Sequence, residues 1–140
     1  MDARVIHFGW DDCCRVPLLR AAGFDVREAK SLEEMSVALQ KNEHLDVVVI
    51  SETTQQSAEQ VSEMAWRWSL VPVILFRRSQ RPIDEKKFDK IYSCLTPPEI
   101  WLHETVALIA KGDKLRVDCA RVHGEAAGVQ SECDGSLSRT

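Results

Sequence analysis

Four consecutive β-branched residues near the middle of the chain constrain its fold more than any other feature. They are the valines and the isoleucine of the segment Asp46-Val-Val-Val-Ile-Ser51. β-Branched residues favour extended backbone, and an apolar run without polar alternation suits a strand that is covered on both faces. The segment therefore predicts the central strand of a parallel sheet. Because parallel strands need crossover connections, helices are expected on both sides of it.

The chain up to Lys111 meets that requirement, because strand-like and helix-like segments alternate five times along it. Such alternation is typical of α/β proteins, and it predicts one domain over residues 1–111. The expected strands cover residues 4–8, 24–27, 46–51, 72–76 and 90–94, and the expected helices begin near residues 12, 32, 58, 84 and 98. After Gly112 hydrophobic residues are sparse and no period is sustained, so residues 112–140 are expected to form a mostly disordered tail.

Charge and cysteine content narrow the classes of partner. The net charge of -4 argues against broad affinity for nucleic acid or anionic membranes, which rests on basic surfaces. No stretch approaches the ~20 apolar residues of a membrane span, and the N-terminus does not resemble a secretion signal. The five cysteines form no C-x-x-C pair, which suits reduced thiols in the cytoplasm and gives no metal-ligand spacing.

Several segments, taken in order, resemble the receiver domain of bacterial response regulators. They are the strand that follows Asp46, the strand Pro72-Val-Ile-Leu-Phe76, the turn Ala22-Gly23-Phe24-Asp25-Val26 and the late Pro97-Pro98-Glu99. The resemblance covers roughly residues 4–111. It implies a flavodoxin-like, doubly wound α/β fold whose five-stranded parallel sheet has the order 2-1-3-4-5, with the functional site at the carboxyl ends of the strands.

The same resemblance identifies the positions at which a working receiver performs phosphoryl chemistry. Such a domain has an acidic pair after strand one to hold Mg²⁺, an aspartate ending strand three to accept the phosphoryl group, a serine or threonine ending strand four, and a lysine after strand five. Carboxylate oxygens suit Mg²⁺, and the metal offsets the charge of the transferred group. Here these positions hold Gly9 and Trp10, Ser51, Arg77 and, most nearly, Thr96. All four depart from the pattern, and Ser51 has no carboxylate with which to form an acyl phosphate.

These departures imply a degenerate receiver, or pseudo-receiver. We expect a non-catalytic signalling module that binds either another protein or a second copy of the chain. No metal or other cofactor is expected. Arg77 beside Glu52 or Asp11 would then replace the metal with a permanent cation and hold the pocket in one state. An alternative is an active receiver in which Asp11 and Asp12 form the acidic pair and Glu52 is an unusual acceptor.

A further alternative is a cysteine-dependent phosphatase, because Cys14 and Arg20 have the spacing of a phosphate-binding loop between the first strand and the first helix. The sequence disfavours it, since the loop lacks the glycines that let a backbone curl around phosphate.

Two tryptophans are candidate contacts for a partner. Trp66 and Trp68 are two residues apart on a predicted helix and cannot both face inward, and Trp101 lies early in the last helix. Aromatic residues are enriched at interfaces, so Trp66 and Trp101 are the expected contact residues.

Overall fold

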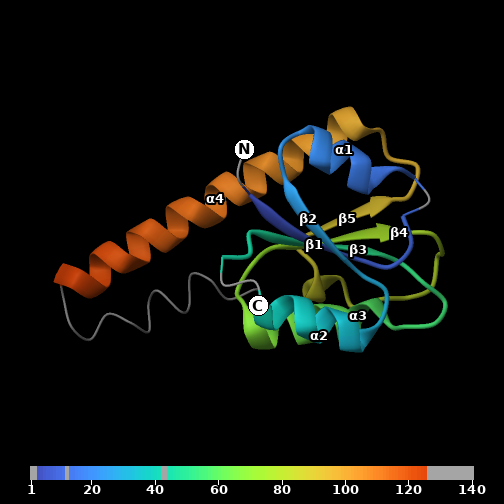
Figure 1. Cartoon of the computed structure of the whole chain (residues 1–140), viewed down its shortest axis with the longest axis horizontal. Coiled ribbons are helices and arrows are strands. Elements are labelled where there is room, and N and C mark those ends of the chain that lie inside the picture. Colours follow the sequence, from blue (N-terminus) through green and yellow to red (C-terminus); the bar gives the residue numbers. More distant parts are fainter. Residues whose placement is uncertain (1–2, 12, 42–43, 126–140) are drawn as a thin grey trace.

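The computed structural model describes residues 3–11, 13–41 and 44–125, the last fourteen of them by their backbone alone. Five parallel strands form one sheet in the order β2-β1-β3-β4-β5 (Figure 1). Their bounds are β1 Arg4–Phe8, β2 Asp25–Ala29, β3 Val47–Ser51, β4 Val73–Arg77 and β5 Lys90–Ser93. The predicted flavodoxin-like topology is confirmed, and every residue of the central strand β3 is buried.

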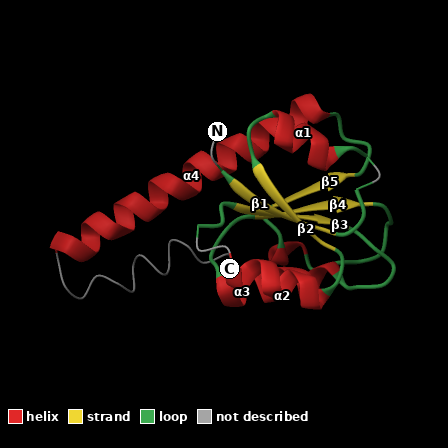
Figure 2. Ribbon diagram, in the orientation of Figure 1, coloured by secondary structure: helices red, strands yellow, loops and turns green. Residues whose placement is uncertain are grey.

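Helices cover both faces of the sheet. Figure 2 shows α2 and α3 on one face, and α1 with the first part of α4 on the other. Their bounds are α1 Arg15–Ala21, α2 Leu32–Lys41, α3 Ala58–Trp68 and α4 Pro98–Glu125. Between β4 and β5, where a helix was expected to begin near residue 84, the chain forms only the short 3-10 helix η1, Glu85–Lys87, because the segment between the two strands is too short for a longer one. Within the described residues, no helix is both long and apolar enough to span a membrane.

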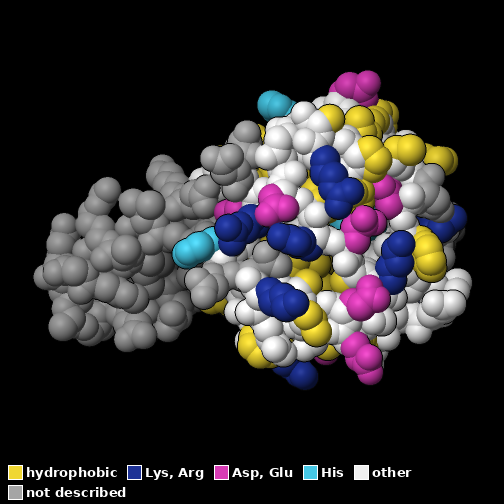
Figure 3. Space-filling model, in the orientation of Figure 1, with side chains coloured by type: hydrophobic (Ala, Val, Ile, Leu, Met, Phe, Trp, Pro, Cys, Tyr) yellow, Lys and Arg dark blue, Asp and Glu magenta, His cyan; other side chains and the backbone are white. Residues whose placement is uncertain are grey.

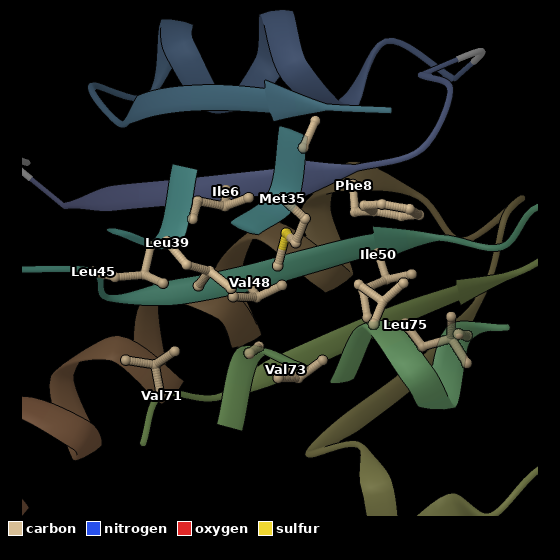
Figure 4. Close-up of a cluster of buried hydrophobic side chains, with 14 of the residues drawn as sticks. Ile6, Phe8, Met35, Leu39, Leu45, Val48, Ile50, Val71, Val73 and Leu75 are labelled. Atoms are coloured by element: carbon tan, nitrogen blue, oxygen red, sulfur yellow. The ribbon is translucent and has the colours of Figure 1, made fainter. Parts of the chain in front are cut away.

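The alternation of side chains along β3 divides the core into two layers. Val48 and Ile50 face α2 and α3, where they pack with Met35 and Leu39 (Figure 4). Val47 and Val49 face the opposite layer, with residues of α1 and α4. Because successive side chains of a strand point to opposite faces, an unbroken apolar run fills both layers.

Trp101 belongs to this second layer, and its expected role in partner contact is wrong. Its side chain is 2% exposed and packs edge-on against Phe76, with 5.4 Å between the ring centroids. Trp101, Thr105 and Ile109 are all buried, because a spacing of four residues brings them onto the helix face that meets the sheet. Trp66 is partly buried against the other layer, whereas Trp68 is 53% exposed.

The last helix continues beyond the domain end that the sequence suggested. α4 is 28 residues long and extends to Glu125, so the expected disordered tail is wrong for the backbone of residues 112–125. One glycine inside a helix costs only about 1 kcal/mol relative to alanine, and Gly112 was too weak a signal to end it. Residues 126–140 lie outside the described residues.

Candidate functional site

The carboxyl ends of β1, β3 and β4 meet at one edge of the sheet. The strand register places Phe8 beside Ile50, and Ser51 beside Phe76. The loops that follow these three strands therefore surround one site, at the edge where doubly wound folds bind ligands.

Ser51, at the expected phosphoacceptor position, is enclosed by two polar side chains. Its hydroxyl oxygen accepts a hydrogen bond from Arg15 Nη2 at 2.6 Å and shares another with His7 Nε2 at 2.9 Å. All three side chains belong to residues that are at most 1% exposed. Ser51 is therefore the centre of a buried polar cluster, which we call the Ser51 cluster: His7, Arg15 and Ser51.

Arg15 brings a positive charge into the interior. The centre of its guanidinium group lies 4.2 Å from the centroid of the Phe76 ring, a cation-π distance. Among the described residues no carboxylate forms an ion pair with it, so the hydroxyl of Ser51 and the aromatic ring are its neighbours. A permanent cation thus lies beside the position at which a receiver would carry its acceptor carboxylate.

His7 is neutral in this environment. Burial lowers the pKa of His7 from 6.5 to about 4, and the positive charges of Arg15 and Lys30 act in the same direction. The carboxylate of Asp11 opposes the shift without reversing it. A neutral imidazole can share a hydrogen bond with Ser51 while Arg15 supplies the only charge inside the Ser51 cluster.

Asp11, a candidate for the acidic pair, is committed to the start of α1. Its two carboxylate oxygens accept the backbone N–H groups of Arg15 at 2.7 Å and Val16 at 2.8 Å. These contacts satisfy amides that a helix start leaves without partners, so α1 begins at Arg15 rather than near residue 12. Cys14 precedes it in the left-handed conformation, with φ of 58°. Asp12 lies outside the described residues.

Gly9 occupies a position that excludes a side chain. Its φ is +98°, and a Cβ atom there would lie 2.5 Å from the carbonyl oxygen of Ser51. The close approach of the two strand ends requires glycine. Trp10, the other residue at the expected acidic-pair position, is 58% exposed.

Glu52 forms a second buried centre next to Ser51. One of its oxygens accepts the backbone N–H groups of Arg78 and Ser79, each at 2.7 Å. The other lies 3.4 Å from Arg77 Nη2 and 3.8 Å from Arg81 Nη2. Burial acts to raise the pKa of Glu52, but the backbone N–H groups and the Arg77 cation outweigh it and lower the pKa below its ordinary value.

The structure therefore brings together only some of the residues that the sequence singled out. The sequence predicted that Arg77 lies beside Glu52 or Asp11, and in the structure it pairs with Glu52. Thr96 lies in the turn after β5, where its backbone N–H donates to Ser93. Among the described residues it forms no hydrogen bond with the Ser51 cluster.

The phosphatase alternative finds no support in the placement of its arginine. Arg20 donates to the carbonyl oxygen of Val26 at 3.1 Å and lies 3.6 Å from Glu28. It is thereby engaged with β2, whereas Cys14 lies at the opposite end of α1.

His7 and Arg15 are the members of the Ser51 cluster that the sequence interpretation missed. The one signal for His7 was a polar residue inside the apolar strand Arg4–Phe8. Arg15 gave no signal, because nothing local shows that a residue in the first turn of a helix reaches the end of another strand.

No protein-family model and no curated protein matches this chain. Solved structures resemble it at low identity. An adenylate cyclase from Rhodopirellula baltica is 14% identical with a TM-score of 0.73, over 90% of this chain and 100% of that one. A CheY-like receiver domain protein from Methanospirillum hungatei is 15% identical with a TM-score of 0.64, over 77% and 94% of the two chains. The chemotaxis protein CheY4 of Vibrio cholerae is 16% identical with a TM-score of 0.63, over 77% and 99%.

Proposed function

We propose that this chain, which has the fold of response-regulator receiver domains, is a signalling module that binds a protein partner and accepts no phosphoryl group. The observation that carries the proposal is the Ser51 cluster. A receiver's acceptor is a carboxylate that a phosphodonor and a metal can both reach. Here the residue at that position is 1% exposed, has no carboxylate and is hydrogen-bonded to Arg15 and His7.

Glu52 is a poor substitute for the acceptor. Its side chain is 3% exposed, and both of its oxygens already contact donors or cations. Phosphorylation would break the two bonds from Arg78 and Ser79, each worth about 1.5 to 3 kcal/mol because the acceptor is charged. Asp11 is committed to α1 in the same way, so neither carboxylate is available for the role that the active-receiver alternative gives it.

A phosphodonor assay tests the absence of phosphoryl transfer. The intact protein is incubated with acetyl phosphate and Mg²⁺, and its mass is measured beside that of a working receiver domain. We expect the working domain to gain a phosphoryl group and this chain to gain none. A hydroxylamine-labile phosphoryl group on this chain, lost in Glu52→Gln, would establish the active-receiver alternative instead.

The exposed end of α3 is the surface that we assign to the partner. Trp68 and Leu70 are each 53% exposed and lie close together in the chain. Large exposed apolar residues that lie together are typical of interaction sites. This assignment replaces Trp101, which is buried, and moves the α3 contact from Trp66 to Trp68.

Affinity capture with matched variants tests this surface. The wild type, Trp68→Ser and Val37→Ser serve as baits, since Val37 on α2 is 48% exposed and gives a comparable loss of apolar surface elsewhere. A partner retained by the wild type and Val37→Ser but lost with Trp68→Ser is expected. Light scattering of the same proteins shows whether that partner is a second copy. Equal retention by all three baits would remove the α3 end from the interface.

A further inference from the structure

We propose that the cavity above Glu52 binds a small aromatic phosphate of the nucleoside monophosphate class, without covalent chemistry. The cavity has a volume of about 510 Å³ and lies between the loops that follow β1, β3 and β4. Ligand pockets commonly measure about 300 to 1,000 Å³, so it has the size for such a molecule. The inference goes beyond the proposed function, because it supplies an input signal that needs no acceptor aspartate.

Hydrogen bonds to Glu52 fix the backbone of the loop after β4, which lines the cavity. The Glu52 carboxylate bonds two consecutive backbone N–H groups of this loop, those of Arg78 and Ser79. Arg77 donates to the carbonyl oxygen of Arg81, which closes the same loop. Arg81 in turn reaches the carbonyl oxygen of Thr53 at 3.5 Å and so joins this loop to the one after β3. A site held in place before binding loses less entropy when a ligand arrives.

The charge around the cavity favours an anion. Glu52 is the one carboxylate among the described residues that line it, and its side chain is 3% exposed. The guanidinium groups of Arg77 and Arg81 lie beside that carboxylate. Arg78, in the same loop, adds a third positive charge. Positive charge is therefore in excess. The Arg81 side chain is 59% exposed, so its guanidinium can be reached from the cavity.

Phosphate suits this wall better than a simple halide ion. The planar fork of an arginine matches the paired oxygens of phosphate. Thr54 also lines the cavity, and its hydroxyl group offers a further donor.

Trp10 supplies a surface for an aromatic ring. It lines the cavity and is 58% exposed, and Lys30 Nζ lies 4.4 Å from its ring centroid. Stacking of a base on an aromatic side chain contributes about 1 to 3 kcal/mol and tolerates any base. The ring and the arginines border one cavity, so a ligand that satisfies both carries a base and a phosphate in one molecule.

A second cavity lacks this selectivity. This cavity lies at the edge of β2 and has a volume of about 700 Å³. Three basic and three acidic residues line it, so its charges balance. Figure 3 shows basic and acidic side chains interspersed over the face that contains β2 and α2. This cavity therefore gives a matched control for the first.

Isothermal titration calorimetry of the full chain tests the proposal. The probes are the four common nucleoside monophosphates, inorganic phosphate and adenosine. We expect saturable binding of at least one nucleotide, at least about tenfold tighter than phosphate or the matching nucleoside alone. Arg81→Gln is expected to weaken nucleotide binding by about tenfold or more, because it removes a charged hydrogen bond, while Arg20→Gln in the second cavity leaves it unchanged. Thermal melts confirm that both variants are folded.

Trp10→Leu separates the two halves of the ligand. It is expected to weaken nucleotide binding while phosphate binding stays as in the wild type. Absence of saturable binding for all four nucleotides would overturn the proposal. Equal affinities for nucleotide and phosphate, or an equal effect of Arg81→Gln and Arg20→Gln, would overturn it as well. None of these failures bears on the phosphodonor assay, whose outcome is measured independently.

Discussion

Acidification from about pH 7.5 to pH 5 should remove about 2 kcal/mol from the free energy of unfolding, because His7 titrates differently in the folded and unfolded chains. The pKa of His7 is 6.5 in the unfolded chain and about 4 when folded. Between these values the unfolded chain binds the proton and the folded chain does not, so protonation favours unfolding. The stabilisation is complete above pH 6.5 and is lost as the pH falls toward 4. The full loss is about 3.5 kcal/mol, since each pKa unit corresponds to about 1.4 kcal/mol and the pKa values differ by about 2.5 units.

Urea unfolding followed by tryptophan fluorescence at the two pH values measures this loss. His7→Gln keeps a side chain that can hydrogen-bond to Ser51 but cannot titrate, so its stability is expected to change far less. His103→Gln removes an exposed histidine from α4 and serves as the matched control. The pKa of Glu52 is lowered from 4.5, so protonation of this carboxylate affects the stability mainly below pH 5, outside the range of the experiment. The reasoning is refuted if His7→Gln shows the same pH dependence as the wild type.

Three substitutions test the packing and charge around the site. Gly9→Ala is expected to lower the stability by about 1 to 3 kcal/mol, because φ is +98° and the new Cβ would lie 2.5 Å from the carbonyl oxygen of Ser51; an unchanged melting temperature would contradict this. Ile50→Ala should cost about 2 to 5 kcal/mol by urea unfolding, since the residue is 1% exposed, and a loss below about 0.5 kcal/mol would place it outside the core. Arg77→Thr should cost more than the ~1 kcal/mol of an exposed pair, because Glu52 is 3% exposed on its side chain. Its combination with Glu52→Gln should be less than additive in the same assay, whereas full additivity would show that the two residues act independently.

The alternation of strands and helices could be predicted from local features of the sequence, whereas the strand order 2-1-3-4-5 was predicted from the resemblance to receiver domains. The apolar run of β3 identifies a strand covered on both faces, and one such strand with crossover helices leaves few arrangements of the sheet. The ends of elements were harder to predict. α1 starts at Arg15 because a carboxylate outside the helix, that of Asp11, accepts its first amides. α4 passes through Gly112, whose cost is small compared with the gains along a long helix.

The site was predicted only where its residues follow a strand. Ser51, Glu52 and Arg77 stand at strand ends, so the resemblance alone placed them at one edge of the sheet, and the Arg77–Glu52 pair followed from that placement. His7 and Arg15 reach the same edge through side-chain directions that no spacing rule reveals. The interior cation was therefore expected at Arg77, whereas the guanidinium beside Ser51 belongs to Arg15.

Arg15 also explains why the departures from the receiver pattern depend on one another. An aspartate at position 51 would lie against the Arg15 guanidinium, whose Nη2 is now 2.6 Å from the hydroxyl oxygen of Ser51, and would pair with that cation instead of with a metal. An acidic residue at Gly9 is sterically excluded by the carbonyl oxygen of Ser51, so one half of a metal-binding pair cannot be restored there. Asp11 could supply a carboxylate only by releasing the first amides of α1, the helix that carries Arg15. The serine, the arginine, the glycine and the helix cap thus form one arrangement around a buried, fixed cation.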